Sequence, residues 1–353
     1  MTSQHLQRAL SPANLGRLPL KNRIIKAATY EGKTPDGVPG ELLLDFHRAI
    51  VEGGTAMTTI GYCTTEADGR INDQMMWMHE GIRDRLSHMN RTLKQAAPDV
   101  KVSGQMTHCG NFSKNRKLQR LKRPLGPSRQ FNMLGLPSGL PFAGAMTVQD
   151  IDYLVQTYHD AAKLMMETGF DAVEIHFSHG YGLSQFISPK TNRRTDAYGG
   201  SLENRMRLPL RALEAVRRAV GDDFPILGKI GLTDGVRGGL RIEEAIEVAA
   251  MLDRAGIDAL ICSGGTSSFN PMVYFRGETL DKGLVEVETN PIAKLGLKLI
   301  GPKMFRYYPY EELYFMEGAR RVRDRVNCQM VYIGGCTDLE SVEQVMREGF
   351  DFI

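Results

Sequence analysis

Short apolar runs rich in β-branched residues alternate along the chain with longer segments whose apolar residues recur at helical spacing. This pattern predicts strands at 23–29, 55–61, 100–106, 171–176, 225–231, 258–262 and 329–333, and a last one that begins near Asp351. It predicts helices at 41–52, 147–167, 202–220, 242–255 and 339–348. A glycine pair at Gly53 ends the first of these helices, and a capping box from Thr147 to Asp150 opens the second.

Repeated strand–helix units predict a parallel sheet with helices outside it. Eight strands favour a closed (β/α)8 TIM barrel over an open doubly wound sheet, and no GxGxxG turn follows the first strand. We expect one barrel domain over residues 1–353, with long loops after strands 3 and 6 at 109–146 and 263–310. Because barrel active sites lie at the carboxyl ends of the strands, the chemistry should follow each strand.

Composition narrows the class of protein further. The 353 residues carry a net charge of +3 and 42% hydrophobic residues, and no stretch has the length and polarity of a membrane span or a secretory signal. Five scattered cysteines without a CxxC pair are typical of a reduced, cytoplasmic protein. A basic run at 114–129 is by default a solvated loop, or it could attract a phosphate-bearing nicotinamide or acyl-CoA; no motif supports nucleic-acid binding.

The stretch that follows the fourth predicted strand is the richest in reactive side chains, with His176, His179 and Tyr181 close together. One interpretation is packing, with His176 inside the barrel and Tyr181 in a loop. A metal site is disfavoured, because the histidines are spaced i, i+3 and no acidic ligand follows, so we expect no metal. In the third interpretation the two imidazoles donate to one carbonyl oxygen and the tyrosine supplies a proton.

The run at 188–205, together with the sequence FDAVEIH at 170–176, resembles the old yellow enzyme family of flavin-dependent oxidoreductases. The segments at 21–29, 103–108 and 227–230 and the pair Gly334-Gly335 resemble further landmarks of that family in the same order. The resemblance implies an FMN-binding barrel enzyme reduced by NADH or NADPH. It also implies that hydride passes from the flavin to activated C=C bonds, typically those of α,β-unsaturated carbonyls (enones).

The resemblance also assigns roles to individual residues. His176 and His179 resemble the residues that bind the substrate carbonyl oxygen, and Tyr181 resembles the proton donor. Tyr30 is a candidate for the substrate pocket, and either Thr29 or Tyr30 for tuning the flavin. The residues that resemble flavin contacts are Ala27, Ala28, Thr29, Gly61, Tyr62, Gln105 and Lys229, with Gly334 and Gly335 as candidates for holding the phosphate through backbone N–H groups.

Several alternatives stay open at this point. The chain ends at Ile353, at the start of the eighth predicted strand, so we expect the sequence to be a fragment that lacks the closing segment. A larger iron–sulfur relative of the 2,4-dienoyl-CoA reductase or amine dehydrogenase type is one alternative. A flavin-binding protein without turnover is another alternative. A weaker one is an aldolase in which Lys229 is the nucleophile that forms a Schiff base. The oligomeric state is also open, with a homo-oligomer among the possibilities.

Overall fold

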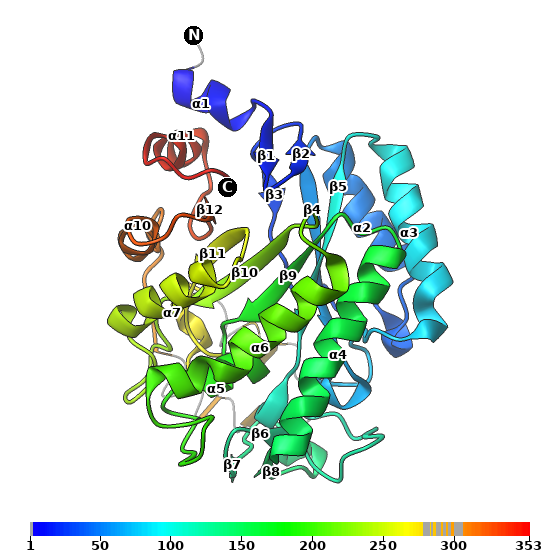
Figure 1. Ribbon diagram of the computed structural model, residues 1–353, viewed down its shortest axis with the longest axis vertical. Helices are drawn as coiled ribbons and strands as arrows, with labels where there is room; N and C mark the ends of the chain where they lie inside the picture. The colour runs from blue at the N-terminus through cyan, green and yellow to red at the C-terminus, as the bar shows by residue number, and fades with distance from the viewer. Residues whose placement is uncertain are drawn as a thin grey trace.

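Parallel strands form the centre of the computed structural model (Figure 1). The structure describes residues 3–277 and 306–353 and, between them, residues 283, 285, 286, 291, 294, 295, 298 and 299. Seven strands make one curled sheet in the order β12-β11-β10-β9-β5-β4-β3. Their bounds are Ile25–Lys26 (β3), Met57–Thr64 (β4), Lys101–Thr107 (β5), Ala172–Phe177 (β9), Ile226–Gly231 (β10), Ala259–Ser263 (β11) and Gln329–Val331 (β12). Every pairing in this sheet is parallel, as the repeated units predict.

The last three residues of the chain bridge the two edges of this sheet. Phe352 pairs in parallel with Val331 of β12, and its carbonyl accepts a hydrogen bond from the Tyr332 N–H at 2.9 Å. On the other side, the Ile353 N–H donates to the Arg23 carbonyl, and the Ile353 carbonyl accepts from the Ile25 N–H at 2.8 Å. These contacts lie where the sequence predicts the start of the eighth strand, and they connect β12 to the segment at β3 across the two edges of the seven-stranded sheet.

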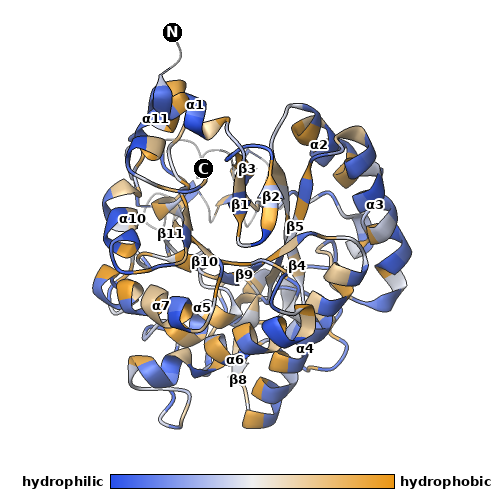
Figure 2. Ribbon diagram, turned by 45° about the horizontal axis from the view of Figure 1, so that its top comes forward, coloured by the Kyte–Doolittle hydropathy of each residue, from blue (hydrophilic) through white to orange (hydrophobic). Residues whose placement is uncertain are grey.

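The helices lie around the strands (Figure 1), and Figure 2 shows that each of them combines hydrophobic and hydrophilic residues. The buried residues of these helices are mostly apolar. The barrel helices within the described residues are Glu41–Glu52 (α2), Arg83–Ala96 (α3), Val148–Glu167 (α4), Leu202–Val220 (α6), Ile242–Arg254 (α7), Met316–Arg323 (α10) and Leu339–Arg347 (α11). The capping box at the start of α4 is present, with the Thr147 side chain accepting from the Asp150 N–H. Among these described helices, none is both long and apolar enough to cross a membrane.

The amino end of the barrel is closed by a short hairpin that follows the N-terminal helix Gln4–Ala9 (α1). Its strands Ala13–Leu15 (β1) and Leu18–Leu20 (β2) are antiparallel. Leu15 and Leu20 are buried and pack in one apolar cluster with Met57, Leu227 and Phe352 from the strands. This cluster fills the amino end of the barrel with apolar side chains, which leaves the polar interior residues toward the carboxyl end.

Three expectations from the sequence need correction. The first strand is only Ile25–Lys26, because the backbone beyond Lys26 leaves the sheet. The loop after strand 3 folds into a small sheet of Leu125–Gly126 (β6), Gln130–Phe131 (β7) and Phe142–Ala145 (β8) at the carboxyl end of the barrel (Figure 1). The pattern also missed α3 and α10, whose interiors are rich in charged residues. Most of 278–305, in the loop after strand 6, lies outside the described residues.

Candidate active site

Alternate residues of neighbouring strands form layers inside the barrel, because side chains on a strand point to opposite faces in turn. Ala172, Glu174 and His176 follow one another at this spacing on β9. Ala172 packs in the apolar cluster at the amino end, Glu174 lies beside Gln105 of β5, and His176 lies beside Lys229 of β10. The barrel interior therefore changes from apolar to charged to histidine-rich toward the carboxyl end.

The two predicted histidines are hydrogen-bonded to each other. Nε2 of His176 and Nδ1 of His179 lie 2.8 Å apart, and Nε2 of His179 lies 2.7 Å from Oγ of Ser263 at the end of β11. The Thr107 hydroxyl lies 3.3 Å from Nδ1 of His176. In this arrangement each imidazole has a protein partner, so binding both rings to one substrate oxygen requires the histidine–histidine contact to open.

Both imidazoles are held in the neutral form. Burial lowers the pKa of His179 to about 3, with a smaller contribution from the positive charge of Lys229. Burial also lowers the pKa of His176 well below its ordinary value, assisted by His179 and Lys229. A neutral imidazole has one N–H donor and one acceptor nitrogen, so this pair can donate to a substrate oxygen without adding net charge.

Aromatic rings surround the histidines. The ring of Tyr181 lies 4.5 Å from that of His176, and its hydroxyl donates to the Tyr62 hydroxyl at 2.5 Å. Tyr30 stacks on Tyr62 with the ring centroids 5.2 Å apart, and Tyr274 lies 4.6 Å from His179. Burial raises the pKa of Tyr181 well above 10, so its hydroxyl keeps its proton at neutral pH. We call Tyr30, Tyr62, Tyr181, Tyr274 and the two histidines the aromatic box.

A charged cluster lies beneath the aromatic box. Oε1 of Glu174 accepts from Nε2 of Gln105 at 2.5 Å and pairs with Nζ of Lys229 at 3.1 Å. All three side chains are buried, and the other carboxylate oxygen of Glu174 has no hydrogen-bond partner among the described residues. An unpartnered buried oxygen is costly, so this atom is well placed to accept a hydrogen bond from a ligand.

Gly334 and Gly335 follow β12 and line a cavity of about 430 Å³ that also includes Ala27 and Glu174. Both glycines have positive φ, at 115° and 67°. A Cβ at Gly335 would lie 2.8 Å from backbone atoms of Glu311 and Leu313, so only glycine fits there. Neither amide donates a hydrogen bond within the described part of the chain, which leaves both N–H groups free for an anion.

The remaining predicted cofactor contacts lie just after β3 and at the register shift inside β4, between Ile60 and Cys63. A Cβ at Gly61 would lie 2.6 Å from the Thr29 carbonyl oxygen, so the glycine permits this close approach. The Ala28 carbonyl accepts from the buried Nζ of Lys229 at 3.5 Å. Thr29 is exposed, and its hydroxyl contacts Lys26 and Glu31, whereas Tyr30 belongs to the aromatic box. Of the two candidates for the place beside the flavin, Tyr30 is the one whose side chain contacts another residue of the aromatic box, because it stacks on Tyr62.

Acidic residues from distant parts of the sequence form hydrogen bonds and ion pairs with part of the basic run at 114–129. The Asp68 carboxylate accepts from the backbone N–H groups of residues 119–121, at 2.6 to 2.8 Å. Arg120 pairs with Asp150 and Glu66, and Lys117 pairs with Asp73. The run is therefore an ordered loop and only partly a free positive surface.

Three residues of the site were missed by the sequence analysis. Glu174 could have been found, because it lies two positions before His176 on the same strand face. Ser263 ends a predicted strand but carries no distinctive motif, and Tyr274 lies in the long loop after it. Within the described ranges, no group of three or more histidine, cysteine, aspartate or glutamate side chains is arranged to hold a metal ion.

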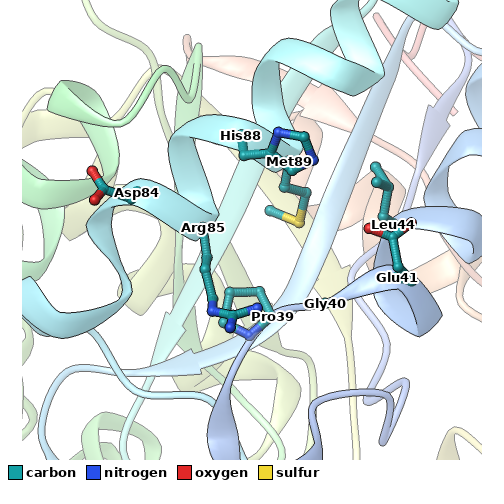
Figure 3. Close-up of a pocket in the computed structure, with 8 residues that line it drawn as sticks. All are labelled: Pro39, Gly40, Glu41, Leu44, Asp84, Arg85, His88 and Met89. Carbon is teal, nitrogen blue, oxygen red and sulfur yellow. The ribbon is translucent and has the colours of Figure 1, made fainter.

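A separate cavity of about 330 Å³ lies between α2 and α3, outside the strands (Figure 3). It is lined by residues that include Leu44, Arg85, His88 and Met89, and by none of the predicted site residues. The candidate site is therefore the carboxyl end of the barrel, where the predicted residues converge.

Comparisons with known proteins agree with this architecture. The sequence model of the NADH:flavin oxidoreductase / NADH oxidase family matches residues 10–268. The 4,4'-dithiodibutanoate disulfide reductase of Rhodococcus erythropolis is 34% identical over 354 residues, which cover 100% of this chain and 86% of that protein. An NADH oxidase of Thermoanaerobacter brockii is 26% identical over 99% of this chain, which spans only 48% of that longer protein.

The structure of an old yellow enzyme homologue from Zymomonas mobilis matches with a TM-score of 0.72 and 19% identity, covering 97% of this chain and 86% of that one. At this identity the likeness establishes the fold alone, a TIM barrel.

Proposed function

The chain belongs to the NADH:flavin oxidoreductase / NADH oxidase family of FMN-dependent enzymes that use NADH or NADPH, and from this premise we propose that it reduces activated C=C bonds of small α,β-unsaturated carbonyl compounds. One observation carries the proposal. A protonated Tyr181 hydroxyl and a neutral histidine pair lie side by side at the carboxyl end of the barrel, above a buried lysine. Hydrogen-bond donors, a proton source and a fixed positive charge are the groups that such a reduction requires.

The residues at the site fit FMN on three counts. The cavity beside Gly334 and Gly335 is lined by two backbone N–H groups that donate to no group in the described part of the chain, which suits a phosphate. The unpartnered oxygen of Glu174 can accept from a polar ring edge, and Gln105 and Lys229 lie beside it. The ring system would be bordered by residues that follow β3 and by residues at the register shift inside β4, namely Ala27, Ala28, Thr29, Gly61 and Tyr62. When bound, FMN supplies the hydride that NADH or NADPH provides.

The side chains of the aromatic box would divide the remaining work. His176 and His179 would give up their mutual hydrogen bond and donate to the substrate carbonyl oxygen, which polarises the conjugated C=C bond. Tyr181 would hold its proton at its hydroxyl oxygen and deliver it to the carbon next to the carbonyl. Tyr62 accepts from this hydroxyl and so fixes its position, while Tyr30 would cover the outer side of the substrate pocket.

Disulfide reduction is a second candidate, favoured by 34% identity over the whole chain to a relative named for a dithiodibutanoate substrate. The same site could serve, with the balance RSSR + NAD(P)H + H⁺ giving two RSH and NAD(P)⁺. In that reaction Tyr181 would protonate a departing thiolate. The two candidates share the cofactor and differ in the electrophile.

One set of assays separates these candidates. The purified protein should carry a flavin absorption spectrum that NADH or NADPH bleaches without oxygen. Cyclohexenone should restore the oxidised spectrum and consume NAD(P)H in the steady state. Restoration by 4,4'-dithiodibutanoate alone would favour disulfide reduction, and restoration by neither would indicate a flavin protein with another acceptor. A colourless protein that cannot be reconstituted with FMN would refute both.

A further inference from the structure

A basic cleft opens beside the aromatic box and has no role in the chemistry described above. Its volume is about 400 Å³, and its lining includes Asn72, Asp73, Lys114, Arg116 and Lys117. It lies between the loop after β4 and the basic run that follows β5. The cleft therefore combines a positively charged wall with a position at the carboxyl end of the barrel.

The cations of the cleft are unequally compensated. Lys117 pairs with Asp73 at 2.9 Å, and the charge of Asp36 also acts on it. Among the described residues, the Arg116 side chain donates only to neutral groups, the carbonyls of Ser138 and Pro137 at 2.8 and 3.0 Å. The exposed Lys114 ammonium has no acidic partner among the described residues. Two positive charges are thus available to a ligand, and the two carbonyls hold Arg116 in place.

Direct contacts connect the cleft to the aromatic box. The Tyr30 hydroxyl donates to Oδ1 of Asn72, which lines the cleft, at 3.4 Å, and Tyr30 stacks on Tyr62. On the other side, the Lys114 N–H donates to the Ile71 carbonyl, and Ile71 packs in the apolar cluster that contains Tyr181. One layer of side chains therefore separates the cleft from the proposed proton donor.

We propose that this cleft binds the anionic group, a carboxylate or phosphate, of a molecule whose reacting end occupies the aromatic box. The inference rests on the proposed function, because it extends the same site to a preference for acidic substrates or for a phosphorylated nicotinamide. Lysine and arginine recognise both anions through charge-assisted hydrogen bonds.

The test uses the FMN-loaded protein and two probes, 4-oxopent-2-enoate and its methyl ester, in which esterification removes the charge of the carboxyl group. Each variant is compared with the wild type on the same probe, so that the different intrinsic reactivities of acid and ester cancel. The variants are Lys114→Gln, Lys114→Arg and, as a matched control from the same basic run outside the cleft, Lys122→Gln. For Lys114→Gln, kcat/KM for the acid should fall about tenfold, the effect of losing one charge-assisted hydrogen bond, and the value for the ester should change less than about twofold. Lys114→Arg and Lys122→Gln should behave like the wild type.

The nicotinamide arm distinguishes the two sources of the anion. If Lys114→Gln raises KM for NADPH but not for NADH and leaves the acid-to-ester ratio unchanged, the cleft holds the cofactor phosphate. If it lowers the acid-to-ester ratio alone, the cleft holds a substrate carboxylate. Equal changes for both probes and both nicotinamides, or no change in any of them, would overturn the proposal.

Calorimetric titration with 4-oxopentanoate, which has no C=C bond to reduce, and with NADP⁺ and NAD⁺ tests the cleft without turnover. If neither enone is reduced but Lys114→Gln weakens one of the anions, the proposed function fails and the anion site stands. If the wild type binds neither 4-oxopentanoate nor NADP⁺ more tightly than Lys114→Gln does, the site is refuted.

Discussion

The hydroxyl oxygens of Tyr181 and Tyr62 lie 2.5 Å apart, although 119 positions separate the two residues in the sequence. Tyr181 is the donor, and burial raises the pKa of both groups. This contact holds the proposed proton donor beside His176 and makes the role of each tyrosine separable by experiment.

Replacing Tyr181 by Phe should lower the rate of enone reduction by about 10²–10⁴-fold, because a positioned proton donor is lost. Anaerobic reduction of the flavin by NAD(P)H should remain close to the wild-type rate. Tyr62→Phe keeps the donor Tyr181 but removes the hydroxyl that accepts from it, so the rate of enone reduction should fall only about fivefold. Stopped-flow measurement of the two half-reactions checks both, and equal effects on the two half-reactions would argue against proton donation by Tyr181.

His176→Ala should weaken the binding of an enone by about tenfold, because a hydrogen bond to its carbonyl oxygen is lost. Since burial lowers the pKa of His179 to about 3 and that of His176 well below its ordinary value, neither should cause an inflection in kcat/KM between pH 5 and 8. A pH–rate profile of the wild type checks this. A histidine-dependent inflection near pH 6.5 that disappears in His176→Ala would show that the pair is charged during turnover.

Acid should destabilise the fold through buried histidines. Burial lowers the pKa of His47 to about 3, so the folded state keeps this group neutral while the unfolded state binds a proton below pH ~6.5. Its contribution to stability is therefore complete above that pH and is lost as the pH falls toward 3. Between pH 7.5 and 5 the loss should be about 2 kcal/mol for this histidine.

Urea denaturation of His47→Gln at both pH values checks this prediction. The variant should be less stable at pH 7.5, since the bond between Nδ1 of His47 and the Thr58 hydroxyl is altered, but less sensitive to acid. The exposed His88→Gln is the control for the loss of a histidine. An unchanged acid sensitivity in His47→Gln would contradict the assignment.

The pair Glu174–Lys229 should set the reduction potential of the bound flavin. Lys229→Gln removes a positive charge that would stabilise the reduced anion, so the potential should fall. Glu174→Gln removes the compensating negative charge and should raise it. Shifts of about 30 mV or more, or about 1.4 kcal/mol for a two-electron couple, should appear with opposite signs in photoreduction against a reference dye. Shifts of the same sign would indicate a general disturbance of the site.

Gly335→Ala should impair FMN retention, because its added Cβ meets backbone atoms at 2.8 Å in a conformation with φ of 67°. The free energy of unfolding should also fall, by about 1–3 kcal/mol. Gly349→Ala has a positive φ of 88° without any atom within 4 Å of the added Cβ, so it measures the conformational cost alone. If both variants retain FMN equally well by fluorescence titration, Gly335 does not contribute to the phosphate site.

Local sequence patterns were enough to predict most helices and strands. Helices α2 and α6 begin and end where the pattern predicts, and the capping box of α4 is present, because periodicity and caps depend on residues a few positions apart. The order of strands followed from the repeated units, and the motifs of the old yellow enzyme family pointed to the FMN enzyme class.

The contacts between side chains from distant segments became visible only in the folded protein. It joined Glu174 to Gln105 and Lys229, His179 to Ser263, and Tyr30 to the basic cleft through Asn72. It also neutralised part of the basic run with acids from distant segments. These contacts depend on the register of neighbouring strands and on how loops pack over the barrel end. Strand register and loop packing cannot be predicted from local patterns, because the packing free energy that determines them is shared among residues far apart in the chain.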